Sequence, residues 1–351
     1  MQITTVGIDL AKDVFQVHGV DERGKAVLRK QLRRDQVAAF FATMPSCLVG
    51  MEACGGAHHW VRKLQVFGHT VKLMAPQFIK PYVKSNKTDA ADAEAISRPT
   101  MRFVSVKSIE QQSVLALHRV RQGFVKARTA QANQIRGLRG EYRLIVPQGI
   151  GHIASRVPEL LEDVSSELPG SFRQLIDRLL EHLKELHRQE IEVQIRTWHR
   201  SSEASRRLEK VPSIGPLTAS ALTTTVGDAK NFDNSRQLAA WLGLVPRQHS
   251  SGGKPTLLGM GKRGDAYLRT LLIHGARSVI YRAGRRADAD NWLVRLTKRL
   301  NTNIAVVALA NKTARIAWAL LARNREFEPG AHGSCAQTGA GKIIESALSW
   351  I

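Results

Sequence analysis

The chain has 351 residues, enough for two or three domains, and its 52 lysines and arginines against 30 aspartates and glutamates give a formal net charge of +22. This excess favours a polyanionic partner, nucleic acid above all, over the alternative of a generally basic soluble protein. The three cysteines, Cys47, Cys54 and Cys335, have no C-x-x-C spacing, and we find neither a secretory signal nor an apolar stretch of membrane-span length, so the sequence predicts a cytoplasmic protein without disulfides or structural zinc.

Short apolar runs in the first hundred residues are typical of buried strands. The run from Ile3 is followed by Asp9 and the run from Leu48 by Glu52, so both end on a carboxylate. We also expect strands at residues 14–20, 25–31 and 70–74, and helices at residues 36–44, capped by Asp35, and 57–67. Three strands, then helix, strand, helix, strand and helix, is the element order of a ribonuclease-H-like α/β sheet.

Four acidic residues of this region are candidate metal ligands. Asp9 and Glu52 lie at strand exits, and Asp89 and Asp92 stand three residues apart in an alanine-rich helical stretch. Carboxylates that converge repel one another unless a cation lies among them, and oxygen ligands suit magnesium or manganese. Taken singly, each acid is better explained as a turn residue, a cap or a first-turn helix residue, and the metal site is favoured only when the four are taken together with their order and flanking residues.

The middle of the chain predicts a basic helical connector. Residues 107–145 contain no proline and read as one long helix, and residues 171–198 as a second, which together suggest an antiparallel coiled-coil arm. The first helix has a heptad stripe at Leu117, Val120, Phe124, Ala127 and Leu138, interrupted by Gln131 and Gln134. Its candidate nucleic-acid contacts are Arg119, Arg128 and Arg136. A solvated charged face and a subunit interface are the alternatives.

The last third predicts a mostly helical domain. Residues 208–222 resemble a helix-hairpin-helix element, in which the turn at Gly215 would offer backbone N–H groups to a phosphate. Helices are expected at residues 232–242, from 264 onward and at 291–323, and a flexible tail from 325. Between them, Ser250-Ser251-Gly-Gly reads by itself as a flexible loop. The basic residues around it are Lys254, Arg263 and Arg269.

Several of these motifs resemble one known family. Gly7-Ile-Asp9, Gly50-Met-Glu52 and the Asp89–Asp92 stretch resemble the DEDD (RuvC-like) domain of the one-ten family of insertion-sequence transposases, with its eleven-eleven subgroup and the related pilin-gene invertases. Gly243-Leu-x-Pro, then Ser251-Gly, then Lys-Arg-Gly and Leu-Arg269, is similar to the family's transposase domain. The resemblance spans residues 1 to about 324.

The resemblance implies specific roles. Asp9, Glu52, Asp89 and Asp92 would form a metal-binding acidic tetrad. Ser251 would be the nucleophile, with Ser250 as the register alternative, and Arg269 would neutralise phosphate charge. The resemblance further implies a structured guide RNA and a homo-oligomer, a dimer or a tetramer.

The predicted domains are 1–100 (RuvC-like), 101–206 (connector), 207–324 (transposase) and 325–351 (tail). We therefore expect a DNA transposase and recombinase. The alternatives are a metal-dependent nuclease of the Holliday-junction type and a non-catalytic nucleic-acid scaffold.

Overall fold

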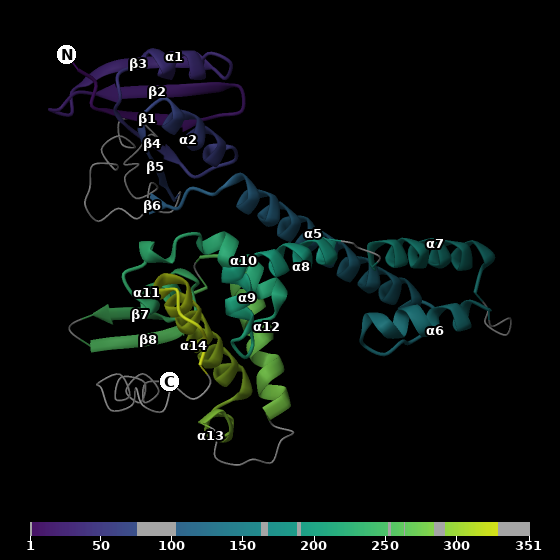
Figure 1. Ribbon diagram of the computed structural model, residues 1–351. Coiled ribbons are helices and arrows are strands. Elements are labelled where there is room, and N and C mark those ends of the chain that lie inside the picture. The colour runs from purple at the N-terminus through teal and green to yellow at the C-terminus, as the bar shows by residue number, and fades with distance from the viewer. Residues whose placement is uncertain are drawn as a thin grey trace. The chain divides into compact units, whose positions relative to one another are not determined.

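The computed structural model describes residues 2–75, 103–162, 168–187, 191–251, 254–262, 264–283 and 292–328 (Figure 1). The chain forms two compact units. The first unit is Met1–Glu110 together with Val226–Asp233, and the second is Gln111–Thr225 together with Asn234–Ile351. The finer division into four predicted domains stays a prediction.

The first unit is built on a mixed six-stranded sheet in the order β3-β2-β1-β4-β5-β6. β1 pairs in parallel with β4, and β4 with β5, while the other neighbours are antiparallel. The strands are β1 (Thr5–Leu10), β2 (Val14–Val20), β3 (Ala26–Arg33), β4 (Leu48–Glu52), β5 (Thr70–Met74) and β6 (Phe103–Val104). The five strands expected from the sequence are therefore confirmed, within two residues at their ends.

Two helices, α1 (Val37–Thr43) and α2 (Ala57–Val66), cover one face of this sheet. Alternate strand residues such as Val6 and Ile8 are fully buried beneath them, because successive side chains of a strand point to opposite faces. Phe41 and Leu64 are the matching apolar residues on the helices. One detail of the expectation is wrong: Gln36, not Asp35, is the N-cap of α1, and its side chain makes no capping hydrogen bond.

The first unit is completed by a segment that comes more than a hundred residues later. Val226–Asp233 packs on residues just before the long helix α5. The Ser105 hydroxyl donates to the Val226 carbonyl oxygen, and the Asn231 amide nitrogen donates to Ser105 Oγ at 2.6 Å. Gly227 has φ +66°, and a Cβ there would lie 3.1 Å from the Ser105 side chain, so this contact fits glycine best.

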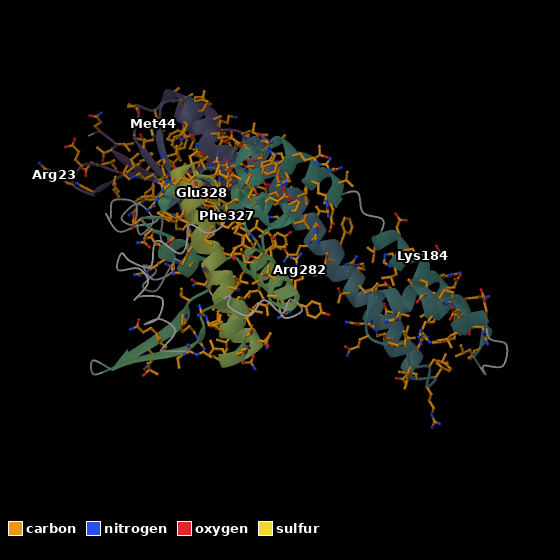
Figure 2. All side chains as sticks on the ribbon, turned by 60° about the horizontal axis from the view of Figure 1, so that its bottom comes forward. Arg23, Met44, Lys184, Arg282, Phe327 and Glu328 are labelled. Carbon is orange, nitrogen blue, oxygen red and sulfur yellow. The ribbon has the colours of Figure 1, made fainter. Side chains whose placement is uncertain are left out.

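Three helices of the second unit share a separate apolar core. Figure 1 shows α6 (Ile150–Glu162) and α7 (Gly170–His187) beside the far end of α5 (Ile109–Gly140). The core contains Ala132, Ile135, Ile153, Val157, Ile176, Leu180 and Leu183. α7 is charged on its outer side, where Lys184, labelled in Figure 2, pairs with Glu181 at 2.6 Å.

The predicted two-helix arm is therefore wrong in part. The expected second helix, residues 171–198, is found as α7 and α8 (Ile191–Ser201), and residues 188–190 between them lie outside the described residues. α6 was not expected, because Pro147, Gly149 and Gly151 end the first predicted helix and no helix is predicted before residue 171. Pro158 lies inside α6.

The predicted stripe on α5 is also wrong in part: Leu138 packs against the three-helix core, but Ala127 is exposed. Val120 is 47% exposed, whereas Gln131, expected to interrupt the stripe, is buried and its Oε1 lies 2.9 Å from His182 Nδ1. Ala132, Ile135 and Arg139, at spacings of three and four, face the three-helix core instead.

A buried polar network joins α5 to the rest of the second unit. His118 is 2% exposed, with Nδ1 2.9 Å from the Tyr267 hydroxyl and Nε2 3.1 Å from Ser220 Oγ. The Ser220 hydroxyl donates to the Pro216 carbonyl oxygen, so His118 Nε2–H donates to Ser220 and Nδ1 accepts from Tyr267. Burial, with a smaller contribution from Arg121, lowers the pKa of His118 to about 4. The network therefore requires a neutral imidazole.

The remaining elements of the second unit form a helical body with one hairpin. They are α9 (Glu203–Glu209), α10 (Pro216–Val226), α11 (Ser235–Trp241), β7 (Pro246–Ser251), β8 (Lys254–Met260), α12 (Ala266–Ala283), α13 (Trp292–Arg299) and α14 (Thr302–Arg323). The short helix η2 (Ala229–Asn231) belongs to the first unit. The helix-turn-helix of α9 and α10 matches the predicted helix-hairpin-helix element in position. The hairpin was not expected. The predicted tail lies almost wholly outside the described residues.

Helix α14 is long and apolar enough, by length and composition, to cross a membrane, so the expectation that no stretch reaches that length is wrong. It is a core helix here. Its residues Ala310, Ala314 and Ala317 are fully buried, and α14 packs against α11 and α12.

Two glycines allow close packing around α12. Gly264 has φ +88°, and a Cβ there would lie 1.8 Å from the Trp241 carbonyl oxygen. A Cβ on Gly275, inside α12, would lie 2.0 Å from the Ser213 carbonyl oxygen. The turn between α9 and α10 therefore packs directly on the backbone of α12.

Gly275→Ala should destabilise the protein by about 2 kcal/mol or more, because its new methyl group would overlap a backbone carbonyl that cannot move alone. The matched control is Gly123→Ala in the interior of α5, where nothing lies within 4 Å of the place that a Cβ would take. That change should stabilise the protein by about 0.5–1 kcal/mol, since alanine favours a helix over glycine. Urea denaturation measures both, and equal effects would contradict the close approach.

The neutral His118 predicts a loss of stability in acid. Its pKa is about 4 in the folded protein and about 6.5 when unfolded, so the unfolded chain binds more protons as the pH falls below 6.5. Between pH 7 and pH 5 this costs about 2 kcal/mol. In His118→Gln the loss of stability between pH 7 and pH 5 should be smaller by about 2 kcal/mol. His152→Gln, at an exposed histidine, should lose as much stability as the wild type. Denaturation at a series of pH values tests this, and a slope unchanged in His118→Gln would refute it.

Candidate active site and nucleic-acid contacts

Asp9 and Glu52 are brought together by the register of β1 and β4. Their parallel pairing ends at Ile8 opposite Met51, so each acid is the next residue on its strand. Ile8 and Met51 are buried on the helix-covered face. The two acids therefore lie on the opposite face, at the carboxyl ends of adjacent parallel strands, and both are half-buried.

The residues around this acid pair on the same face are small or basic. Gly7 and Gly50, two positions before each acid and on the same face, carry no side chain. The neighbouring strands contribute His18, opposite Gly7, and Lys72, opposite Gly50. His18 is 5% exposed, and the Lys72 ammonium group lies 4.6 Å from the centre of the Phe103 ring. The sheet thus places glycines and basic residues beside the two carboxylates.

The other half of the predicted tetrad, Asp89 and Asp92, lies outside the described residues. Within the residues that are described, no three acidic, histidine or cysteine side chains come close enough to hold a metal ion. Asp9 and Glu52 nevertheless fit a divalent cation as a partial ligand set, because both present carboxylate oxygens on one face at neighbouring strand ends.

Ser250 and Ser251 lie at the end of β7. In the hairpin, Ser250 pairs with Pro255 and Ser251 with Lys254, next to the connecting glycines. The exposed strand position of His249 is two residues from that of Ser251, and such positions share a face of a strand. The two candidate serines, by contrast, occupy positions on opposite faces of the ribbon. By this alternation Ser251 shares the strand face of His249 and Ser250 does not.

The basic residues predicted near the serine lie in different surroundings. Arg269, half-buried in the first turn of α12, donates from Nη1 to the Leu242 carbonyl oxygen at 3.0 Å, so it helps to fix the end of α11. Lys254 is the first residue of β8, and Arg263 lies outside the described residues. Gly215 directly precedes α10, but the left-handed residue of that turn is Ser213, with φ +82°. Pro216 is the first residue of α10 and has no N–H group. The turn at Gly215 therefore offers fewer backbone N–H donors to a phosphate than expected.

The three arginines proposed on α5 do not form one stripe. Arg119 is exposed, and Arg128 and Arg136 are half-buried. Nine residues are two and a half turns, so Arg119 and Arg128 project from opposite sides of the helix. Arg136 donates to Asn133 Oδ1 at 2.9 Å. A phosphate backbone following one helix face would therefore meet only part of this set.

Two other basic residues of the predicted arm are not surface groups. Lys107 precedes α5 and is 5% exposed, and burial lowers its pKa to about 8. Arg139 is 1% exposed, and among the described residues none of its guanidinium nitrogens has a hydrogen-bond partner. Burial also lowers the pKa of Arg139. Both residues should be left out of the predicted nucleic-acid surface.

The hairpin and the residues beside the acid pair had recognisable signals. A Gly-Gly pair at residues 252–253 between two candidate strands is a sequence pattern that predicts a hairpin, here formed by β7 and β8. His18 and Lys72 follow from alternation along strands already predicted from the sequence.

Two family models match the chain. One, described as "Transposase IS116/IS110/IS902 family", matches residues 205–291, and a DEDD-type model described as "Transposase" matches residues 6–142.

Curated proteins are similar over nearly the whole length. The chain is 50% identical over 338 residues to a "Probable family 20 transposase" of Pseudomonas aeruginosa, covering 94% of this chain and 100% of the relative. It is 44% identical over 338 residues to the "Transposase for insertion sequence element IS1111A" of Coxiella burnetii, covering 94% and 92%. It is 26% identical over 281 residues to the "Pilin gene-inverting protein" of Moraxella bovis, covering 75% and 76%.

If Asp9 and Glu52 share a cation, magnesium should raise the melting temperature of the wild type, and Glu52→Gln should abolish that rise. A cation at ten times its Kd adds about 1.4 kcal/mol. Without metal, Glu52→Gln should melt at or above the wild-type temperature, because one of two repelling charges is removed. Glu22→Gln, at an exposed turn residue, is the control. A magnesium effect that survives in Glu52→Gln would contradict the paired site.

Proposed function

The chain belongs to the IS116/IS110/IS902 transposase family and is an enzyme of insertion-sequence transposition, and we propose that it cuts and rejoins DNA with an acidic metal site and a serine nucleophile. The resemblance expected from the sequence motifs is confirmed for the family and for its pilin-inverting relatives. DNA is the partner that follows from membership, and the DEDD domain suggests dependence on a divalent metal.

The observation that carries the proposal is the placement of Asp9 and Glu52 at adjacent strand ends on one face of the sheet. Three antiparallel strands followed by two parallel ones support a ribonuclease-H-like, RuvC-like reading of this unit. In that reading Asp89 and Asp92 complete the tetrad, and magnesium or manganese is the cation.

The residues of the chain would divide the chemistry as follows. Asp9, Glu52, Asp89 and Asp92 would hold the cation, which would supply polarisation of a phosphate and offset its charge. The Ser251 hydroxyl attacks a DNA phosphorus atom. A new serine–phosphate ester forms, the bond from phosphorus to one deoxyribose oxygen breaks, and that oxygen leaves as the strand end.

A proton must leave Ser251 as it attacks, since a serine hydroxyl is a weak nucleophile at its ordinary pKa. His249, on the same face of β7 by position, is the candidate base. Arg269, Lys254 and Arg263 would neutralise charge on the phosphate. The ester conserves the energy of the broken bond, so attack by another strand end reverses the step and exchanges strands.

Guide RNA and self-association are part of the proposal. The net charge of +22 and exposed basic residues such as Arg119 support a polyanion in addition to the DNA target. A homo-oligomer, a dimer or a tetramer, is expected from the family resemblance. Gel filtration with nuclease-treated and untreated protein tests both ideas.

The decisive experiment looks for a covalent protein–DNA adduct. With magnesium and an element-end duplex, the wild type should give an adduct that resists denaturant, and Ser251→Ala should give none. Ser250→Ala is the matched control for register and should retain it. Asp9→Asn should reduce the adduct by at least about a hundredfold if the acidic site assists the serine step.

Other outcomes identify the rival functions. Cleavage without an adduct would indicate a metal-dependent nuclease in which Ser251 is structural. Binding without cleavage would indicate a scaffold. Wild-type adduct formation by Asp9→Asn would show that the acidic site takes no part in the serine step.

A further inference from the structure

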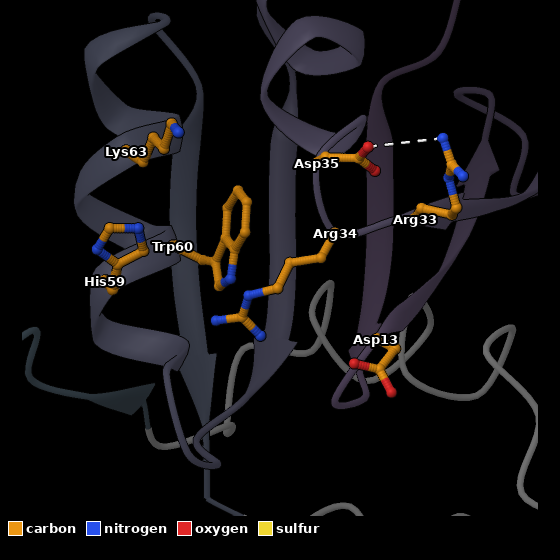
Figure 3. Close-up of a pocket in the computed structure, with 7 residues that line it drawn as sticks. All are labelled: Asp13, Arg33, Arg34, Asp35, His59, Trp60 and Lys63. Atoms are coloured by element: carbon orange, nitrogen blue, oxygen red, sulfur yellow. Dashed lines mark ion pairs between the residues drawn. The ribbon is translucent and has the colours of Figure 1, made fainter.

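A pocket of about 550 Å³ opens on the first unit, on the side of the sheet that α1 and α2 cover (Figure 3). Trp60, which belongs to the core beneath these helices, lines the pocket, and its ring packs edge-on against that of Phe15 with the ring centres 5.1 Å apart. Asp9 and Glu52 face the other side of the sheet, so the pocket is separate from the acid pair. It has no part in the chemistry proposed above.

Most of the residues that line this pocket carry hydrogen-bond donors or positive charges. Figure 3 shows His59, Trp60 and Lys63 along α2, with the Arg34 side chain reaching toward the indole ring. The Arg34 guanidinium carbon lies 5.8 Å from the centre of the Trp60 ring and 5.7 Å from that of Phe15. The Lys63 ammonium nitrogen lies 5.5 Å from the Trp60 ring. Aromatic rings thus hold two positive charges at one opening.

A second observation points to a missing acceptor. Trp60 is 4% exposed, and its Nε1–H has no hydrogen-bond partner among the described residues. A buried donor left unpaired costs about 1–3 kcal/mol, so its retention calls for an explanation. Arg34 lies across the indole and also has donors to spare, since its one side-chain hydrogen bond to a described residue is to the Lys12 carbonyl oxygen at 3.3 Å.

We propose that this pocket binds a backbone phosphate of nucleic acid through Arg34, Lys63 and the Trp60 indole N–H. A phosphate oxygen accepts from the guanidinium and draws it off the indole, which exposes the N–H to a second oxygen. A stacked base is the less suitable ligand, because the Trp60 ring is buried and its face is not free. The proposal rests on nucleic acid as partner but not on the catalytic chemistry.

The acidic residues of the pocket predict which substitutions should strengthen binding and which should weaken it. Arg33 and Asp35 form an ion pair at 3.6 Å with both side chains about 70% exposed, so they contribute little net charge at the rim. Asp13 also lines the pocket and would repel a phosphate. Removing the charge of Asp13 should therefore strengthen binding, whereas removing that of Arg34 should weaken it.

The test is binding of a labelled duplex DNA and of a labelled hairpin RNA by fluorescence anisotropy, with EDTA present so that metal chemistry is silent. Arg34→Gln and Lys63→Gln should each weaken binding about fivefold and lower the salt slope by about 0.7–0.9, the value for one phosphate. Asp13→Asn should tighten binding about twofold. Trp60→Phe, which keeps the ring and removes the N–H, should weaken it about threefold.

Arg23→Gln is the matched control, since Arg23 is an exposed arginine in the turn between β2 and β3 (Figure 2) and is not part of the pocket. Loss confined to the DNA probe or to the RNA probe supports the proposal and identifies the source of the phosphate. Equal affinities for Arg34→Gln and Arg23→Gln, or no gain in Asp13→Asn, would overturn it. If the wild type binds neither probe, the proposed function fails together with the pocket. If the wild type binds but Arg34→Gln behaves like Arg23→Gln, only the pocket fails.

Discussion

The register of a single strand pair positions the candidate catalytic acids. β1 and β4 run parallel with Thr5 opposite Leu48, and four residues later the same pairing brings Asp9 and Glu52 to adjacent positions. A slip by one residue would turn one acid toward the helix-covered core, where an ionised carboxylate has no water and no partner. The buried Val6, Ile8, Val49 and Met51 prevent such a slip, because they must all face the same core. Apolar packing on one face of the sheet therefore determines where the two acids lie on the other face.

Much of the first unit could be predicted because its signals are local. Thr70–Met74 was expected with the observed limits, and the strand-end acids followed from reading where apolar runs stop. The pairing of Asp9 with Glu52 could not be derived from local pattern alone, since register is a property of two strands. The pocket could not be predicted either, because Arg34 lies in the turn after β3 whereas His59 and Trp60 lie on α2, and no spacing in the sequence links the two segments.

The second unit was predicted less well for a different reason. Helix α5 contacts different partners along its length, so no single heptad register describes it. Its buried positions include Gln131, His118 and Arg139, which a search for apolar residues passes over. Pro158 reads as a helix breaker yet lies within α6. The β7–β8 hairpin was missed because serine and glycine are poor strand formers, although the Gly-Gly pair between two candidate strands is a signal for a hairpin.

The assignment of Val226–Asp233 to the first unit has a consequence for biosynthesis. A ribosome makes the whole sheet long before it makes the segment whose Asn231 and Gly227 meet Ser105. The nascent first unit must wait for more than a hundred further residues before its last piece arrives, so it cannot finish folding as an independent module until Val226–Asp233 has been made. Gene fragments of the element that end before this segment would yield a sheet lacking its final packing, and such truncated products should be short-lived in the cell.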